Sequence, residues 1–154
     1  MKTSQESVAL ICRRVHGRTK YLAQWSDVRQ MFLLIGGHVE AGESYRDCCM
    51  RAVAEQLDIE AERDFHVAPA PLQARQSYIA ESGSAGVVTE HQVELYAVAI
   101  HEESAGEGIA GDPANRWLDL AEIRRGETSD GRPISPQVET VLTLFGALPT
   151  KANA

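Results

Sequence analysis

The most constraining feature of this sequence is a strand-like run that stops at two glycines and is soon followed by a helix. Residues 31–35 are all apolar, and Gly36 and Gly37 end the run. The stretch Ser44–Leu57 contains neither Gly nor Pro, which is typical of a helix. Its first residue is followed three positions later by Asp47, a pattern similar to a capping box. We therefore expect a strand, a short loop and a helix with a well-defined start.

Short apolar segments before and after this helix are rich in strand-forming residues. His16-Gly17-Arg18 indicates a turn after the first segment, and residues 82–86 indicate a turn between the last two. Residues 106–113 are rich in glycine and are expected to form a loop. The expected strands lie within residues 8–12, 21–23, 72–80 and 87–100.

A second helix is expected near the end of the chain. Ser135 is suited to the N-cap and Pro136 to the first helical position. The apolar residues that follow are at helical spacing: Val138, Val141, Leu142 and Phe145. Strands that surround two helices indicate a mixed α/β or α+β layered fold. A length of 154 residues fits a single domain, residues 1–154.

Composition and charge exclude several classes of protein. The net charge of −7 disfavours binding to a nucleic acid polymer, which needs basic surface to displace phosphate counterions. No apolar run approaches the roughly 18 residues that would span a bilayer, so no membrane partner is expected. Residues 1–7 are polar and lack the apolar stretch of a secretory signal, which favours a cytoplasmic location.

The three cysteines have no regular spacing. Cys12 lies in an apolar run, and Cys48 and Cys49 are adjacent. An odd number without a Cys-x-x-Cys pair indicates neither a disulfide framework nor a zinc site. We expect all three to be reduced and buried, because a free cysteine behaves as a small apolar residue.

The segment from Gly37 onward resembles the signature of the Nudix hydrolase family. That signature is a glycine, five residues, a glutamate, seven residues, and then Arg-Glu-apolar-x-Glu-Glu-x-Gly-apolar. The residues that fall in register are Gly37, Glu43, Arg51, Val53, Glu55 and Ile59. The stretch Arg116-Trp117-Leu118-Asp119-Leu120 before the late helix is also similar to the family. The resemblance covers about residues 7–146 and implies a Nudix-type α/β/α sandwich with a mixed sheet between helices.

Members of this family cleave a nucleoside diphosphate linked to another moiety by water attack at phosphorus, assisted by Mg²⁺ or Mn²⁺. The resemblance therefore implies a small phosphorylated, nucleotide-like ligand. It marks Glu43, Arg51 and Glu55 as candidate catalytic residues. The candidate metal ligands are Glu55, Gln56, the carbonyl of Gly37 and a later carboxylate, Glu90. The candidate ligand-binding residues are Gly36 and Gly37, whose backbone can approach a ligand closely, and Arg13 in the cationic first hairpin.

The sequence departs from the family pattern at three positions of the signature. Ala52 replaces the glutamate after the arginine, Gln56 replaces the second of the paired glutamates, and Asp58 replaces the glycine. Alanine offers no oxygen, and glutamine offers a neutral carbonyl oxygen. Of the three helical carboxylates, only Glu55 remains, so binding of Mg²⁺ or Mn²⁺ is expected to be weak.

Each candidate residue also has a plain structural interpretation. Glu55 is compatible with a solvated helix position, and Arg51 with a scaffold role through Glu43 or Asp47. The cationic residues of the first hairpin are compatible with a hydrated rim. Glu90 and Glu94 are equally compatible with ordinary strand positions.

Three functional hypotheses follow from the sequence. The first is a Nudix-type hydrolase with a weakened or rearranged metal site. The second is a non-catalytic Nudix-fold module that binds a nucleotide-like ligand or has a regulatory role, and the third is a scaffold without a small ligand. The family resemblance also implies a homodimer as a frequent assembly. The linked moiety is not identified by the signature, because specificity in the family resides in loops outside it.

Overall fold

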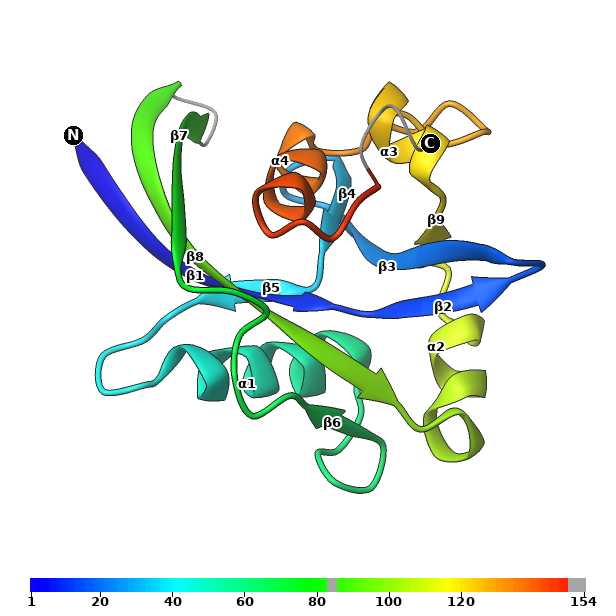
Figure 1. Ribbon diagram of the computed structural model, residues 1–154. Coiled ribbons are helices and arrows are strands. Elements are labelled where there is room, and N and C mark those ends of the chain that lie inside the picture. Colours follow the sequence, from blue (N-terminus) through cyan, green and yellow to red (C-terminus); the bar gives the residue numbers. More distant parts are fainter. Residues whose placement is uncertain (83–85, 150–154) are drawn as a thin grey trace.

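The computed structural model describes residues 1–82 and 86–149 (Figure 1). The larger of two sheets is built around β1 (Lys2–Leu10) and β8 (Val87–Ile100), which run parallel, with Lys2 opposite Thr89. Three shorter strands pair antiparallel with this central pair. They are β5 (Gly36–His38) on β1, and β6 (Phe65–Val67) and β7 (Gln76–Ser82) on β8. The sheet is therefore mixed, and β1 lies inside it with a partner on each side.

A second, antiparallel sheet is centred on β3 (Arg18–Ser26). Its other strands are β2 (Cys12–Val15), β4 (Met31–Leu34) and β9 (Asn115–Leu118). The expected turn between β2 and β3 is formed by His16 and Gly17, whose φ angles are 51° and 78°. Two successive residues with positive φ are typical of the two-residue hairpin turn that matches strand twist.

Helices cover the larger sheet from both sides (Figure 1). Helix α1 (Tyr45–Leu57) packs on one face, and α4 (Pro136–Leu144) lies over the other, near the short α3 (Leu120–Arg125). Each face has its own core. The α1 core includes Ala9, Cys49, Val53, Phe65 and Tyr96, and the α4 core includes Phe32, Val93, Leu95, Val138 and Leu142. The α/β class and the layered arrangement expected from the sequence are confirmed.

Both ends of α1 agree with the sequence. Ser44 is the N-cap, and its hydroxyl accepts a hydrogen bond from the backbone N–H of Asp47 at 3.0 Å. The helix ends at Asp58, which adopts the left-handed conformation with φ 53° and ψ 52°. Asp58 thus takes the backbone conformation that glycine adopts most readily at a helix end. The helix at Ser135 and Pro136 is also confirmed.

Several expectations about the elements were wrong. Residues 106–113 are not a loop, because a π-helical turn, η1 (Glu102–Gly106), continues into α2 (Glu107–Gly111). Buried Ala105 and Ile109 anchor this helical segment to the core. β1 begins at Lys2 rather than Val8, because its polar first half pairs with β8. β7 begins at Gln76 rather than Leu72.

The expected turn at residues 82–86 lies mostly outside the described residues. Cys12 is exposed at the start of β2, which corrects the expectation that all three cysteines are buried. Cys48 and Cys49 are buried, and all three are free thiols. Among the described residues, no helix is both long enough and apolar enough to cross a membrane.

Candidate functional site

Arg51 ties the loop after β5 to helix α1. Its guanidinium donates to both carboxylate oxygens of Glu43, at 2.8 and 3.0 Å, and to the carbonyl of His38 at 3.1 Å. The backbone N–H of Glu40 also donates to Glu43, at 3.1 Å. These bonds, that from Arg51 above all, lower the pKa of Glu43 to about 2. Arg51 and Glu43 thus form a bidentate ion pair that fixes the loop.

Gln56 is engaged with the backbone at the start of β5. Its side-chain amide donates to the carbonyl of Gly36 at 2.5 Å, and its oxygen accepts from the N–H of Gly36 at 3.4 Å. Gln24 donates to the backbone carbonyl of Gln56 at 2.7 Å. The amide therefore uses both its donor and its acceptor to hold β5 against α1.

The remaining signature positions differ in burial. Ala52 is 2% exposed and lies under β5, where a Cβ atom added to Gly37 would be 3.7 Å from the Ala52 Cβ. The Glu55 side chain is 67% exposed and lies 3.7 Å from Arg51. Glu55 is therefore the one carboxylate that remains of the three helical signature positions, and its ion pair with Arg51 is long and exposed.

Two carboxylates of β8, Glu90 and Glu94, were the other candidates for a metal site with Glu55. Glu90 lies on β8 and accepts a hydrogen bond from Gln92 at 3.0 Å. Glu94 is held by Arg75, at 2.7 Å, and by the Tyr96 hydroxyl, also at 2.7 Å. Within residues 1–82 and 86–149, no three His, Cys, Asp or Glu side chains form a group that could hold a metal ion.

The two buried thiols add no metal ligand either. Burial raises the pKa of Cys48 to about 11 and that of Cys49 to about 12. A cysteine sulfur is a soft ligand, whereas Mg²⁺ and Mn²⁺ favour carboxylate, carbonyl and water oxygens, so these residues are poor candidates for the cation of this family. Mg²⁺ prefers several oxygen ligands including carboxylates, and the residues present do not fit a tight site of that kind.

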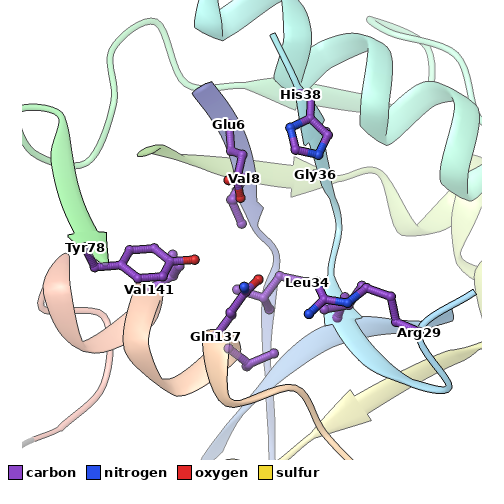
Figure 2. Close-up of a pocket in the computed structure, with 12 residues that line it drawn as sticks. Glu6, Val8, Arg29, Leu34, Gly36, His38, Tyr78, Gln137 and Val141 are labelled. Carbon is purple, nitrogen blue, oxygen red and sulfur yellow. The ribbon is translucent and has the colours of Figure 1, made fainter. Parts of the chain in front are cut away.

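A cleft of about 220 Å³ lies on the opposite face of the larger sheet from α1, under α4 (Figure 2). Its floor includes Gly36, Gly37 and His38 of β5, and Glu6 of β1. Its apolar walls are Val8, Leu33, Leu34, Val138 and Val141. The outer part continues over Ser4, Val28, Thr89 and His91. Concave, mostly apolar pockets with a few polar groups are the usual form of a small-molecule site.

A polar cluster forms part of this cleft. The Glu6 carboxylate accepts from the Ser4 hydroxyl at 2.8 Å and pairs with Nδ1 of His91. The His91 ring stacks on Tyr78, with centroids 4.7 Å apart and an interplanar angle of 12°. Ser4 also contacts Nδ1 of His38 at 3.1 Å. Burial, followed by the nearby Glu6 charge, raises the pKa of the Tyr78 phenol.

Two cationic side chains have different relations to the cleft. Arg29, from the turn between β3 and β4, is exposed and points toward Gln137 across the cleft (Figure 2). Arg13 lies on β2 with its guanidinium 4.3 Å from the Trp117 ring centroid, and it does not line the cleft described above. Arg29 is thus the arginine of this cleft, rather than the sequence candidate Arg13.

Of the sequence candidates, the structure places Gly36 and Gly37 in the cleft, and Glu43, Arg51, Glu55 and Gln56 on or beside α1. Sequence reasoning missed Glu6, Tyr78, His91, Arg29 and Gln137. The period-two pattern of strands could have indicated which of these side chains share a face. Ser4 and Glu6 are two residues apart in one strand, and Thr89, His91 and Val93 alternate in the same way in another. The signal is weak, because a single histidine in a strand is most often an ordinary core residue.

Comparison with solved structures shows the same fold in three proteins of low sequence identity. A Nudix hydrolase from Nitrosomonas europaea is 20% identical, with a TM-score of 0.59 over 99% of this chain and 97% of that one. The C. elegans Ap4A hydrolase is 14% identical, with a TM-score of 0.58 over 94% and 97%. Shewanella oneidensis NrtR, solved with a 27mer DNA, is 13% identical, with a TM-score of 0.62 over 92% of this chain and 59% of that one.

No curated protein matches this chain in sequence. The family model described as the NUDIX domain matches residues 2–138, most of the chain. That match includes the loop and helix from Gly37 to Ile59, the strands that line the cleft, and the first α4 residues of its lining, Gln137 and Val138. The chain belongs to the Nudix family.

Proposed function

We propose that this Nudix domain binds a small phosphorylated, nucleotide-like ligand in the cleft under α4, and that it hydrolyses nucleoside diphosphate derivatives weakly or not at all. Glu55 and the Gly37 carbonyl are the groups left to bind Mg²⁺ or Mn²⁺. One carboxylate provides little of the charge that a polyanionic substrate and its cation require. Binding is therefore the function that the site supports best.

The observation that carries the proposal is the position of the Gln56 amide. The resemblance assigns this position to a metal-binding carboxylate, yet here a neutral amide is bonded to both backbone groups of Gly36. The N–H of the Gln56 side chain occupies the Gly36 carbonyl, which is then not free to bind a cation. Releasing it would leave a partly buried carbonyl without its partner, at a cost of about 1–3 kcal/mol.

Ligand binding is supported by the contents of the cleft. Apolar walls from β1, β4 and α4 suit a flat ring, and the exposed guanidinium of Arg29 suits a phosphate group. Among the similar structures is an Ap4A hydrolase, whose name states a dinucleotide substrate. A nucleotide-like ligand is consistent with both the chemistry of the cleft and that likeness.

Calorimetry and product release together test this proposal. The panel includes ADP-ribose, dinucleoside polyphosphates, nucleotide sugars and nucleoside triphosphates, each with EDTA and with excess Mg²⁺ or Mn²⁺. We expect at least one compound to bind in EDTA, with turnover far below the usual enzyme range of roughly 1 to 10³ s⁻¹. Turnover within that range would overturn the proposal of weak hydrolysis, and absence of binding by every compound would overturn the ligand site.

A substitution in the cleft tests whether the ligand binds there rather than beside the signature helix. Arg29→Ala removes the candidate phosphate contact, and we expect it to weaken binding of charged nucleotides more than that of nucleosides. Arg18→Ala is the matched control, because Arg18 is exposed at the start of β3 and does not line this cleft. If the two substitutions change the affinity for charged nucleotides equally, Arg29 does not bind the phosphate of the ligand.

A further inference from the structure

The two oxygens of the Glu6 carboxylate have different surroundings. Oε2 accepts from the Ser4 hydroxyl and pairs with Nδ1 of His91. Oε1 has no hydrogen-bond partner among the described residues, although the Glu6 side chain is only 16% exposed. A carboxylate oxygen in this setting is a strong acceptor that a ligand donor can satisfy. The contacts of Oε2 hold the carboxylate in a fixed orientation before any ligand arrives.

The neighbours of Glu6 include two buried polar atoms without hydrogen-bond partners among the described residues. Because a carboxylate can only accept, Nδ1 of His91 donates in this contact. His91 is 4% exposed, and within the described residues its Nε2 has no partner. The Tyr78 hydroxyl is likewise buried without a partner in that part of the chain. Of the unpartnered atoms of this cluster, Glu6 Oε1 is the one that can only accept.

These groups meet the apolar part of the cleft. Figure 2 shows the side chains of Glu6, Tyr78 and Gln137 directed toward a common space, with Val141 beside it. A flat ring placed between the apolar walls would turn one edge toward Glu6. Arg29 lies at the other side of the same space, where a phosphate on the ligand would meet it.

From this geometry we infer that Glu6 makes the cleft selective for a ligand ring whose edge donates N–H hydrogen bonds, and that a guanine-type base is preferred over an adenine-type base. The inference rests on the proposed function, because it concerns the ligand of the same cleft. Guanine presents its N1–H and its 2-amino group on one edge. Adenine presents the N1 lone pair at the equivalent place, and that lone pair is repelled by a carboxylate oxygen.

The direct test is calorimetric binding of GDP, IDP and ADP to the full chain. These nucleotides share their ribose and phosphates, so differences among them report the base alone. We expect GDP to bind at least about 10-fold more tightly than ADP, because a hydrogen bond to a charged group typically changes affinity by one to two orders of magnitude. IDP, which keeps N1–H but lacks the 2-amino group, is expected to bind with intermediate affinity.

Glu6→Gln tests the assigned residue. Glutamine keeps the shape but loses the charge, so we expect the ratio of GDP to ADP affinity to fall by about 10-fold or more. Glu103→Gln is the matched control, because Glu103 is exposed in η1 and lines neither part of the cleft. The control variant is expected to keep the wild-type ratio.

The outcomes separate this inference from the proposed function. Measurable but equal binding of GDP and ADP would overturn the guanine preference and leave the ligand site in place. No binding of any nucleotide would overturn both. The ratio measured for the unchanged chain decides the preference even where Glu6→Gln does not fold. If a folded Glu6→Gln protein keeps the wild-type ratio of GDP to ADP affinity, Glu6 does not determine the base preference.

Discussion

At the scale of single residues, Gln56 and Glu55 are adjacent in the sequence and opposite in their surroundings. The Gln56 amide is bonded to Gly36 through both its donor and its acceptor, whereas Glu55 is mostly exposed and has one long ion pair with Arg51. The difference follows from the helix, because a step of one residue rotates the side chain by about 100°. One side chain therefore holds β5 in place, and its neighbour remains available to solvent.

Gln56→Glu should destabilise the protein in the absence of divalent ions. The substitution removes the N–H donor to the Gly36 carbonyl and places a negative charge beside that carbonyl. We expect the free energy of unfolding to fall by about 1–3 kcal/mol in EDTA, as measured by urea denaturation. Mn²⁺ should recover part of the loss, because a cation can then join the two oxygens.

Gln5→Glu provides the control for this change. Gln5 is exposed on β1, and the same substitution there should change stability by less than about 0.5 kcal/mol. If Gln56→Glu leaves stability unchanged in EDTA, the amide contacts with Gly36 contribute little, and the metal position is more open than proposed.

The Arg51–Glu43 pair predicts a specific dependence on pH. The pKa of Glu43 in the folded protein is about 2, below the ordinary value of 4.5, chiefly because Arg51 donates to its carboxylate. A lowered folded pKa contributes stability above the unfolded pKa, and that contribution is lost as pH falls from about 4.5 through about 2. Carbon NMR titration of Glu43 measures the pKa directly.

Arg51→Lys should raise the pKa of Glu43 back toward its ordinary value. Lysine has a single ammonium group and cannot reproduce the planar pair of donors. The acid-induced loss of stability between pH 4.5 and 2 should then be smaller in the variant. An unchanged Glu43 titration in the variant would show that the backbone N–H of Glu40, rather than Arg51, holds the charged form.

At the scale of elements, the loop and helix around Gly37 were the best predicted part of the chain. The start of α1 at Ser44 and its last residue, Leu57, follow from local patterns that need no tertiary information: a side-chain cap and a stretch free of glycine and proline. The end of α1 also matches the signature, since Asp58 takes the left-handed conformation. Local chemistry decides such boundaries.

Elements that depend on distant partners were predicted less well. The polar residues from Lys2 to Ser7 form a strand because β8 pairs with them, and nothing within these residues indicates that partner. The segment from Glu102 to Gly111 is helical because Ala105 and Ile109 reach the core, despite glycines that favour a loop. Tertiary contacts here override local propensity.

Gly36→Ala tests how closely β5 approaches β1. A Cβ atom at Gly36 would lie 2.7 Å from the backbone oxygen of Ser7, so the two strands would have to move apart. We expect a loss of about 1–3 kcal/mol in the free energy of unfolding. Gly108→Ala is the matched control in α2, where an added Cβ meets nothing within 4 Å.

The control should itself change stability in the opposite direction. Alanine is favoured over glycine inside a helix by about 1 kcal/mol, so Gly108→Ala is expected to stabilise the protein by up to that amount. Both values follow from thermal or urea unfolding of the two variants. A Gly36→Ala protein as stable as the parent would show that β5 can move away from β1 without cost.

At the scale of the whole molecule, the helical residues of the signature and the cleft lie on opposite faces of one sheet, and Gly37 is the signature residue that lines the cleft. The signature indicated the α1 side, where the sequence candidates Glu43, Arg51, Glu55 and Gln56 lie. The cleft is assembled from β1, β4, β5, β7, α4 and the turn carrying Arg29. No local pattern relates these segments, so the polar cluster at Glu6 could not be predicted without the fold.

The two cores predict a single unfolding transition. β8 contributes Val93 and Leu95 to the core under α4 and Tyr96 to the core under α1. Neither core can therefore lose its packing without disturbing the strand that serves both. We expect the calorimetric and van't Hoff enthalpies of thermal unfolding to agree. Two resolved transitions would instead divide the chain into parts that unfold separately, against the proposal of one domain.

The parallel pairing of β1 with β8 has a consequence for the order of events during synthesis. The strand partner of Lys2 is Thr89, so β1 is translated well before the strand with which it must pair. At typical rates of translation, the wait lasts roughly 4 to 17 seconds. Glu6 is translated long before His91, so the contact between the two side chains forms only after the intervening residues have been made. During that interval the nascent chain can form the hairpin of β2 and β3 and the helix α1, while the centre of its larger sheet is still missing.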